Sequence, residues 1–364
     1  MDLVHLLMNL IVPPILLTAI VVVWPFYFIY NIVASITKAA FSMEDVTGKV
    51  VLITGASSGI GEYLAYEYAK RGARLALVAR REKQLEEVAK RARAMGSPDV
   101  IISSADVSNF QHCKRFVEEA VNHFGRLDHL VNNAGILSAF FFEEASNITN
   151  AVPVMDINFW GSVYVAHFAL PHLKKTKGKI VANTSASGWL YGPDMSMYSA
   201  SKAAMINFYE TLRIELGSDV TITTVSLGFT ESEMSQGKHL SMEGKVEISE
   251  AKRDAIVRFF PLRSVKESAE IILNGVRRGD RDVTDPSWLR TLYLVKAWRL
   301  WNEDNALGSV DANVKDSLII SEVLRCIHVG LLRVQQGTED RPSMAYAIFM
   351  LGSDTSNVLY KGHQ

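Results

Sequence analysis

Hydrophobic and polar positions divide the chain into an apolar leader, a long alternating middle and a tail of different character. From Leu6 to Thr37 no charged residue occurs, and Leu, Ile, Val, Phe and Trp are abundant. An uncharged stretch of this length is typical of a segment that enters a membrane. It lacks the basic start of a cleaved signal peptide and is longer than the apolar part of one. We therefore predict that residues 1–45 form a membrane anchor that the mature protein keeps.

Three prolines, Pro13, Pro14 and Pro25, interrupt this leader. Each removes a helical hydrogen bond and clashes with the preceding turn, which disfavours one straight helix. A straight helix over the uncharged residues would extend roughly 48 Å, against a hydrocarbon core of about 30 Å. We favour a hairpin that dips into the lipid, and a kinked membrane span is the alternative.

From Lys49 onward, short β-branched runs alternate with amphipathic stretches. This alternation is typical of parallel strands joined by crossover helices. We predict strands over 50–54, 74–79, 100–104, 127–131, 179–184 and 220–226, with helices between them that include 62–71 and 82–95. Right-handed crossovers then predict an α/β fold, a doubly wound parallel sheet of the Rossmann type, with its ligand at the carboxyl edge.

Length, charge and cysteine usage narrow the functional classes. The chain of 364 residues exceeds one dinucleotide-binding domain of roughly 250 residues, and the surplus lies at the two ends. A formal net charge of -1 gives no reason to expect nucleic acid as a partner. Cys113 and Cys326 cannot build a disulfide framework and lack metal-ligand spacing. We therefore expect a reducing compartment and no metal.

A glycine-rich run follows the first predicted strand and opens the first predicted helix. It reads Thr54-Gly55-Ala56-Ser57-Ser58-Gly59-Ile60-Gly61. The first glycine permits a tight turn, the second a close approach of a pyrophosphate and the third close packing of the helix, whose N-terminus faces the phosphates. The predicted cofactor-binding residues of this run are Gly55, Ser57, Ser58, Gly59, Ile60 and Gly61.

Two arginines, Arg80 and Arg81, follow the second predicted strand. They stand where an acidic residue would bind an unphosphorylated adenosine ribose. Guanidinium groups suit a 2′-phosphate instead. We therefore predict NADP(H) rather than NAD(H) as cofactor, with two solvated arginines at a helix start as the alternative.

Tyr198 and Lys202 lie four residues apart on one predicted helix, so their side chains share a face. A free phenol has a pKa of about 10, too high for a base at neutral pH. A nearby ammonium and an oxidised nicotinamide would stabilise the phenolate and lower this pKa. Tyr198 is therefore the predicted general acid and base.

Three motifs, in this order, resemble the short-chain dehydrogenase/reductase family. They are the glycine-rich run, Asn132-Asn133-Ala134-Gly135, and Tyr198-Ser199-Ala200-Ser201-Lys202. The resemblance assigns residues 46–297 to a catalytic domain. With the proline-broken apolar leader, the chain looks most similar to the steroleosins, hydroxysteroid-dehydrogenase-like proteins of plant oil bodies. The implied reaction is hydride transfer between nicotinamide C4 and a carbinol or carbonyl carbon.

The resemblance also implies roles for further residues. Ser185 would hydrogen-bond the substrate oxygen, and Asn158 would hold a relay water against the lysine. Asn133 is open to a second interpretation as a buried structural amide. One departure is Leu227 before Gly228, where the family often has proline. The residues that would contact the cofactor, besides the glycine-rich run and the two arginines, are Asp106, Val107, Asn133, Ala134, Gly135, Tyr198, Lys202 and Ser232.

Apolar residues follow the fourth and fifth predicted strands at the same sheet edge. They favour a pocket for an apolar substrate such as a sterol, and core packing is the alternative. The resemblance implies a mobile lid over 229–261. The apolar residues are Leu137, Phe140, Phe141, Phe142, Trp189, Leu190 and Tyr191.

The tail changes character from about Trp298. The segments 298–303, 321–330 and 339–344 resemble the last helices of plant receptor-like kinase domains. A phosphate loop, a His-Arg-Asp loop and an Asp-Phe-Gly motif are all missing, which excludes phosphoryl transfer. Such helices normally pack on a kinase lobe that this sequence lacks. We expect residues 298–364 to be a poorly docked, non-catalytic appendage from a fused gene or gene model, and a partner-docking module is the alternative.

Together these patterns predict an NADP(H)-dependent, hydroxysteroid-like dehydrogenase that acts on an apolar small molecule. Its expected location is the surface of a lipid droplet (oil body) or the endoplasmic reticulum, with the catalytic domain facing the cytosol. The family resemblance further suggests a homodimer. A structural droplet-coat protein with a silent dehydrogenase fold is the alternative.

Overall fold

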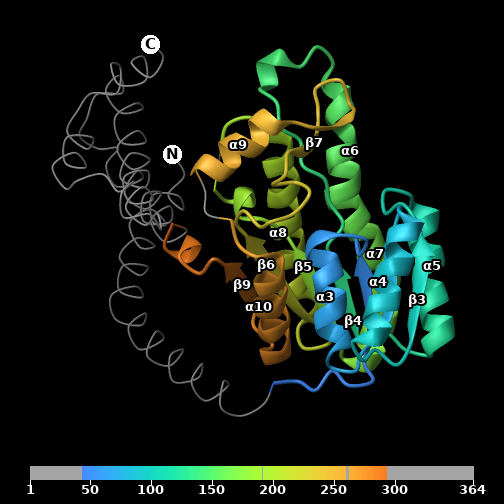
Figure 1. The fold of residues 1–364 in the computed structure, drawn as a ribbon. Helices are drawn as coiled ribbons and strands as arrows, with labels where there is room; N and C mark the ends of the chain where they lie inside the picture. Colours follow the sequence, from blue (N-terminus) through green and yellow to red (C-terminus); the bar gives the residue numbers. More distant parts are fainter. Residues whose placement is uncertain (1–42, 191, 260–261, 293–364) are drawn as a thin grey trace, which may run out of the picture.

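Seven parallel strands form the central sheet of the computed structural model, which describes residues 43–190, 192–259 and 262–292 (Figure 1). The strand order is β3-β2-β1-β4-β5-β6-β9. The chain order reverses between β1 and β4, and the crevice at such a reversal is where doubly wound sheets bind ligands. The predicted doubly wound parallel sheet is therefore confirmed. The strands are β1 (Val50–Thr54), β2 (Arg74–Ala79), β3 (Val100–Ser104), β4 (His129–Asn132), β5 (Lys179–Asn183), β6 (Thr221–Leu227) and β9 (Asp282–Asp285).

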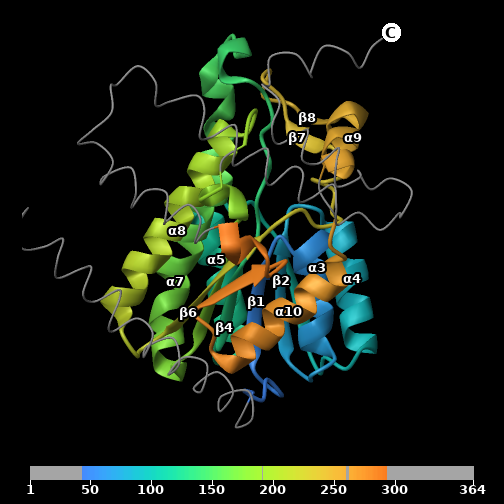
Figure 2. The same ribbon diagram turned by 90° about the vertical axis from the view of Figure 1, so that its left-hand side faces the viewer.

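Helices cover both faces of this sheet (Figure 2). On one face, α3 (Gly59–Ala69), α4 (Glu82–Ala94) and α10 (Val265–Arg278) pack against β-strand side chains such as Val51 and Ile53. On the other face, α5 (Phe110–Phe124), α7 (Gly161–Thr176) and α8 (Ser196–Leu216) pack against Val50 and Leu52. Successive strand residues point to opposite faces, so one buried β-branched run supplies two cores.

For β1, β2 and β3 the predicted bounds are the observed ones. For β4, β5 and β6 the predicted ends differ from the observed ends by one or two residues. The predicted helices 62–71 and 82–95 correspond to α3 and α4. The last strand, β9, was not predicted. It reads Asp-Val-Thr-Asp, with Val283 as its one apolar residue, and pairs in parallel with β6.

A smaller unit lies over the carboxyl edge of the sheet (Figures 1 and 2). It contains the antiparallel strands β7 (Lys238–Leu240) and β8 (Val246–Ile248), followed by α9 (Glu250–Phe259). The backbone N–H of Leu240 donates to the Leu137 carbonyl at 2.7 Å. The segment predicted as a lid is therefore attached to the loop after β4, and its mobility stays a prediction.

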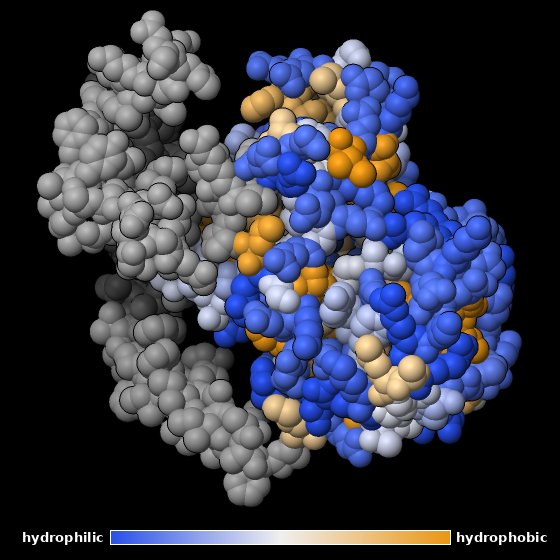
Figure 3. Space-filling view, viewed as in Figure 1, coloured by the Kyte–Doolittle hydropathy of each residue, from blue (hydrophilic) through white to orange (hydrophobic). Residues whose placement is uncertain are grey.

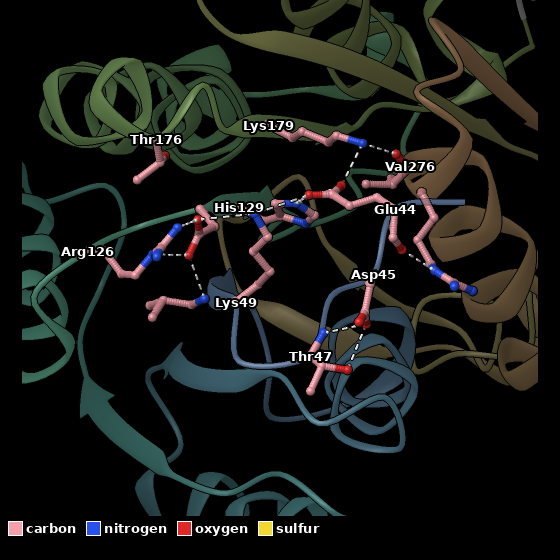
Figure 4. A network of polar contacts seen from close by, with 12 residues as sticks. Glu44, Asp45, Thr47, Lys49, Arg126, His129, Thr176, Lys179 and Val276 are labelled. Carbon is pink, nitrogen blue, oxygen red and sulfur yellow. Dashed lines mark hydrogen bonds and ion pairs between the residues drawn. The ribbon is translucent and has the colours of Figure 1, made fainter. Parts of the chain in front are cut away.

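A polar network holds the start of the described chain at the opposite, amino edge of the sheet (Figure 4). Glu44 pairs with Lys179 at 2.7 Å and with His129 at 3.3 Å. Partial burial raises the pKa of Glu44, but the hydrogen bonds and charges of His129 and Lys179 outweigh it and bring the pKa to about 2. The Arg277 guanidinium also donates to the Glu44 carbonyl. Glu44, which the sequence assigned to the anchor, thus packs against the catalytic domain.

Within 43–190, 192–259 and 262–292, the structure contains no helix that combines the length and apolar character needed to cross a bilayer. The predicted anchor before residue 43 and the predicted appendage at 298–364 lie outside these ranges. The three proposed domain boundaries therefore stay predictions.

Candidate active site

The glycine-rich run forms the turn between β1 and α3 at the carboxyl edge. Gly55 and Gly59 have φ angles of +66° and +62°, a backbone region that favours glycine. A Cβ on Gly61 would lie 2.4 Å from the Gly55 carbonyl oxygen, and one on Gly55 would lie 2.8 Å from the Ala134 Cα. Since α3 begins at Gly59, its free N–H groups point to this turn. The turn thus has the shape and the donors that a pyrophosphate requires.

Asn133 joins the ends of three neighbouring strands. Its side-chain amide donates to the carbonyls of Thr54 and Gly55 at 3.0 and 3.3 Å, and it accepts from Asn183 at 2.8 Å. Its backbone N–H bonds to the Thr54 hydroxyl. The structure thus gives Asn133 the scaffolding role that was the second interpretation of the sequence, while Ala134 lies directly beside the glycine turn.

The two arginines after β2 have different surroundings. Arg80 has a side chain that is 60% exposed, and its nearest ion-pair partner is Asp106 at 3.9 Å. Arg81 reaches across the glycine turn, where it donates to the hydroxyls of Ser57 at 3.2 Å and Ser58 at 2.6 Å. Both cations stand beside the expected adenosine ribose, but Arg81 is already bonded to the protein.

Three further predicted cofactor residues lie at the same carboxyl edge of the sheet. Asp106 accepts from the backbone and hydroxyl of Ser108. Val107 is buried, and a Cβ on Gly161 would lie 2.8 Å from its side chain. Ser232 follows β6 and lies over the glycine turn, since a Cβ on Gly59 would be 3.7 Å from its own Cβ.

The helix α8 brings Tyr198 and Lys202 to one face. The Lys202 Nζ lies 5.7 Å from the centre of the Tyr198 ring and donates to the Asn183 carbonyl at 3.0 Å. Lys202 is 4% exposed, and burial lowers the pKa of its ammonium to about 8. Gly135 is nearby, because a Cβ there would lie 3.6 Å from the Nζ. The cation is thus held between the sheet and the Tyr198 ring.

The Tyr198 phenol is buried, and its surroundings act on its pKa in opposite directions. Burial raises the pKa of the Tyr198 phenol, and a hydrogen bond with Ser185 lowers it by less. The neighbouring Lys202 does not reverse this balance at 5.7 Å. The sequence predicts that this ammonium and an oxidised nicotinamide together lower the Tyr198 pKa. The ammonium at this distance does not outweigh the desolvation of a phenolate, and the joint effect with the nicotinamide stays a prediction.

Ser185 follows β5 and opens a short 3-10 helix (Ala186–Gly188). Its oxygen accepts from the Ser187 backbone N–H at 3.2 Å and from the Ser187 hydroxyl at 3.1 Å. Ser185 acts to lower the Tyr198 pKa through a hydrogen bond, which places the two hydroxyls near each other. A carbonyl or carbinol oxygen placed there would meet both donors.

Asn158 lies in a π-helical turn (Asp156–Trp160) just before α7 and is fully buried. Its side-chain oxygen accepts from the Ile136 N–H at 2.8 Å, and its amide donates to the Ile136 carbonyl and to the Ser201 hydroxyl. All these partners are backbone or side-chain groups of the protein itself. The relay-water role thus stays a prediction, while a positioning role for this side chain follows from its contacts.

Two positioning residues escaped the sequence analysis. Asn183 supplies the carbonyl that holds Lys202 and the amide that meets Asn133. Ser201 is buried, bonds to Asn158 and donates to the Tyr198 carbonyl at 2.7 Å. Ser201 lies inside the motif 198–202, and Asn183 lies in the predicted strand 179–184, where a polar side chain in otherwise apolar surroundings was the available signal.

The predicted substrate residues separate into two groups. Leu137, Trp189 and Leu190 are partly buried beside the catalytic edge, and Phe140 is buried. Phe141 and Phe142 are 51% and 64% exposed, so they are not core residues, and their place in a substrate pocket stays a prediction. The upper end of the molecule in Figure 3 shows such hydrophobic side chains among hydrophilic ones. Tyr191 lies outside the described residues.

Comparisons with known proteins agree with this geometry. Residues 49–242 match the family model for short chain dehydrogenase. The chain is 53% identical over 296 residues to 11-beta-hydroxysteroid dehydrogenase A of Arachis hypogaea, covering 81% of this chain and 84% of that protein. It is 54% identical over 272 residues to 11-beta-hydroxysteroid dehydrogenase 1A of Arabidopsis thaliana, covering 75% and 77%. These relatives give no support to the kinase resemblance of the tail.

Solved structures show the same fold. A short chain dehydrogenase/reductase from Burkholderia phymatum in complex with NAD has a TM-score of 0.63 at 26% identity and covers 76% of this chain and 99% of its own. An alcohol dehydrogenase from Thermococcus sibiricus complexed with 5-hydroxy-NADP has a TM-score of 0.54 at 26% identity, covering 65% and 94%. With the glycine turn and the Tyr198–Lys202 pair in place, the chain belongs to the short-chain dehydrogenase/reductase family and is an oxidoreductase with a nicotinamide cofactor.

Proposed function

We propose that this protein interconverts a hydroxyl group and a ketone on an apolar, steroid-like substrate with NADP(H), at a lipid surface. The observation that carries the proposal is the buried Lys202 ammonium 5.7 Å from the centre of the Tyr198 ring, at the sheet edge where Ser185 follows β5 and acts to lower the Tyr198 pKa. This arrangement provides one proton donor or acceptor and one fixed hydrogen-bond donor for a single substrate oxygen.

The residues divide the chemistry as follows. The cofactor, when bound, supplies or accepts the hydride at nicotinamide C4. In ketone reduction, Tyr198 gives its hydroxyl proton to the substrate oxygen, and Ser185 stabilises the charge that develops there. In alcohol oxidation the proton returns to the Tyr198 oxygen. Lys202 favours the phenolate form and is held in place by the Asn183 carbonyl.

The preference for NADP(H) rests on charge. Arg80 and Arg81 flank the place of the adenosine ribose and occupy the two positions directly after β2, where an acidic residue would hold a 2′-hydroxyl. Ser57 and Ser58 add hydroxyl donors to the same place, because both already contact Arg81. A 2′-phosphate would find guanidinium and hydroxyl donors there.

The apolar substrate rests on the names of the relatives and on the partly buried side chains of Leu137, Trp189 and Leu190 near Ser185. These side chains offer an apolar wall to a substrate of low polarity. The intact catalytic set gives no support to the alternative of a silent coat protein.

The lipid surface rests on the uncharged N-terminal segment. The described chain enters the domain through Glu44 at the amino edge, on the far side of the sheet from Tyr198. An anchor before residue 43 would thus leave the carboxyl edge accessible to substrate. Fractionation of the full chain with membranes, and its loss when residues 1–37 are removed, tests this part.

The homodimer rests on an aromatic surface. Phe110 and Trp160 are 43% and 44% exposed, and both contact Tyr164 on α7 through ring pairs. Exposed aromatic groups of this kind are enriched in interfaces. We expect Trp160→Glu to shift the detergent-solubilised protein toward a monomer in sedimentation.

The test of the reaction uses the purified full chain, NADPH or NADP+, and a panel of sterols and steroids with hydroxyl or ketone groups. We expect turnover with at least one member and a loss of about 10³-fold or more in Tyr198→Phe, which still binds cofactor. If the wild-type chain binds NADP(H) but turns over no member of the panel, the proposed reaction is wrong.

A further inference from the structure

The segment after β6 crosses the glycine turn and is tied to it by charge. Ser232 lies over Gly59, as the 3.7 Å distance to a Cβ built there shows. The next residue, Glu233, accepts from the Arg81 Nη1 at 2.6 Å although 152 positions separate the two in sequence. Arg81 therefore connects the turn after β1 with the segment after β6. We refer to residues 232–238 as the strap.

All three nitrogen atoms of the Arg81 guanidinium donate hydrogen bonds to the protein. Its Nε and Nη2 donate to the Ser57 hydroxyl at 3.3 and 3.2 Å, its Nη2 donates to Ser58 at 2.6 Å, and its Nη1 donates to Glu233. Arg80, one residue earlier, is 60% exposed and approaches Asp106 only to 3.9 Å. Of the two cations beside the adenosine ribose, Arg80 is accessible and Arg81 is paired.

Glu233 is held from two sides. Besides Arg81, Lys238 donates to its second oxygen at 2.6 Å. Partial burial raises the pKa of Glu233, but hydrogen bonds from Lys238 and Arg81 outweigh it, so the pKa lies below its usual value. The group is therefore a carboxylate at neutral pH, and it offers Arg81 the same anionic oxygens as a phosphate.

A 2′-phosphate at Arg81 and the Glu233 carboxylate would compete for the same N–H groups and would repel each other at short range. We propose that Glu233 is a specificity-determining residue that competes with the 2′-phosphate of NADP(H) for Arg81, so that this cofactor exchanges the Arg81–Glu233 pair and releases the strap. NAD(H) has no 2′-phosphate and leaves the pair intact. This inference rests on the proposed preference for NADP(H).

The test compares Glu233→Gln with Glu231→Gln in the full chain. Glu231 lies two positions earlier on the same segment and is exposed, and only its backbone N–H is bonded, to Arg263. We measure the dissociation constants of NADP+ and NAD+ by calorimetry. In Glu233→Gln we expect NADP+ to bind about three- to fivefold more tightly, which is the upper part of the range of one partly exposed charge interaction. NAD+ binding should stay within about twofold, and Glu231→Gln should change neither constant.

A double-mutant cycle supplies the decisive comparison. In an Arg81→Met background, Glu233→Gln should no longer improve NADP+ binding, because the competition requires the guanidinium. Weaker binding of both cofactors in Glu233→Gln would show a merely structural strap and overturn the inference. So would an unchanged NADP+ constant. A wild-type chain that binds NAD+ as tightly as NADP+ would instead refute the proposed cofactor preference, independently of these variants.

Discussion

The Nζ of Lys202 lies 3.0 Å from the carbonyl oxygen of Asn183, so that the last residue of β5 holds the ammonium that lies beside the Tyr198 ring. This contact joins the sheet to α8 inside the site. The cation is 4% exposed, and its burial is unfavourable for stability. The buried Lys202 cation thus lowers the stability of the fold, and its presence is explained by the function of the site.

We predict that Lys202→Met is inactive yet more stable than the wild type at pH 7. Burial lowers the pKa of Lys202 from 10.5 to about 8. Below pH 8 both folded and unfolded chains carry the cation, so the whole unfavourable effect of about 3 kcal/mol is present. It decreases as the pH rises from 8 to 10.5, where the folded chain releases its proton first.

In this variant the Asn183 carbonyl loses its hydrogen-bond partner. This loss costs about 1–2 kcal/mol and so offsets part of the stability gained by removing the buried cation. We thus expect a net gain of about 1–2 kcal/mol in the free energy of unfolding at pH 7, and none at pH 10. Urea unfolding at both pH values measures it. A variant that is less stable than wild type at pH 7 would contradict the account of a costly buried cation.

Ser185→Ala should lower kcat by about 10²-fold, because the substrate oxygen loses one fixed donor. It should also move the pH profile. The hydrogen bond from Ser185 holds the pKa of Tyr198 lower than burial alone would, so its removal raises that pKa. Alcohol oxidation needs the phenolate, and its rate should therefore increase at a higher pH than in the wild type.

The control variant Ser185→Thr keeps the hydroxyl and should retain the wild-type pH profile. Identical profiles for Ala and wild type would refute this role.

Asn158→Ala should destabilise the protein by about 2–4 kcal/mol, since it leaves the Ile136 N–H and carbonyl and the Ser201 hydroxyl without their buried partner. The matched control is Asn207→Ala, which removes a single exposed bond to Ala203 on α8. We expect the control to change the free energy of unfolding by less than about 0.5 kcal/mol. Equal effects of the two variants would exclude a positioning role for Asn158.

Glu44→Gln tests the link between the start of the domain and the sheet. The pKa of Glu44 is lowered from 4.5 to about 2, so its stabilising effect is complete above pH 4.5 and is lost as the pH falls to 2. We expect a loss of about 2–3 kcal/mol at pH 7 and little difference from wild type near pH 2. Asp45→Asn, at an exposed neighbour, is the control and should have a much smaller effect. A pH-independent difference would argue against charge as the cause.

Several tertiary contacts were beyond the reach of the sequence. The strand β9 has one apolar residue, so no alternation marks it, and only its pairing with β6 defines it. The partners of Asn158 and Asn183 come from separate segments. Phe141 and Phe142 have the composition of a pocket wall, but the loop that carries them leaves their side chains exposed.

The sequence by itself determined the sheet, the glycine turn and the Tyr198–Lys202 pair, because each depends on local periodicity or on residues within one turn of a helix. Tertiary structure alone decided that burial raises the Tyr198 pKa, that Asn183 holds Lys202, and that Glu233 reaches Arg81. Desolvation and long-range ion pairs depend on which distant segments the fold brings together, and no local pattern records that.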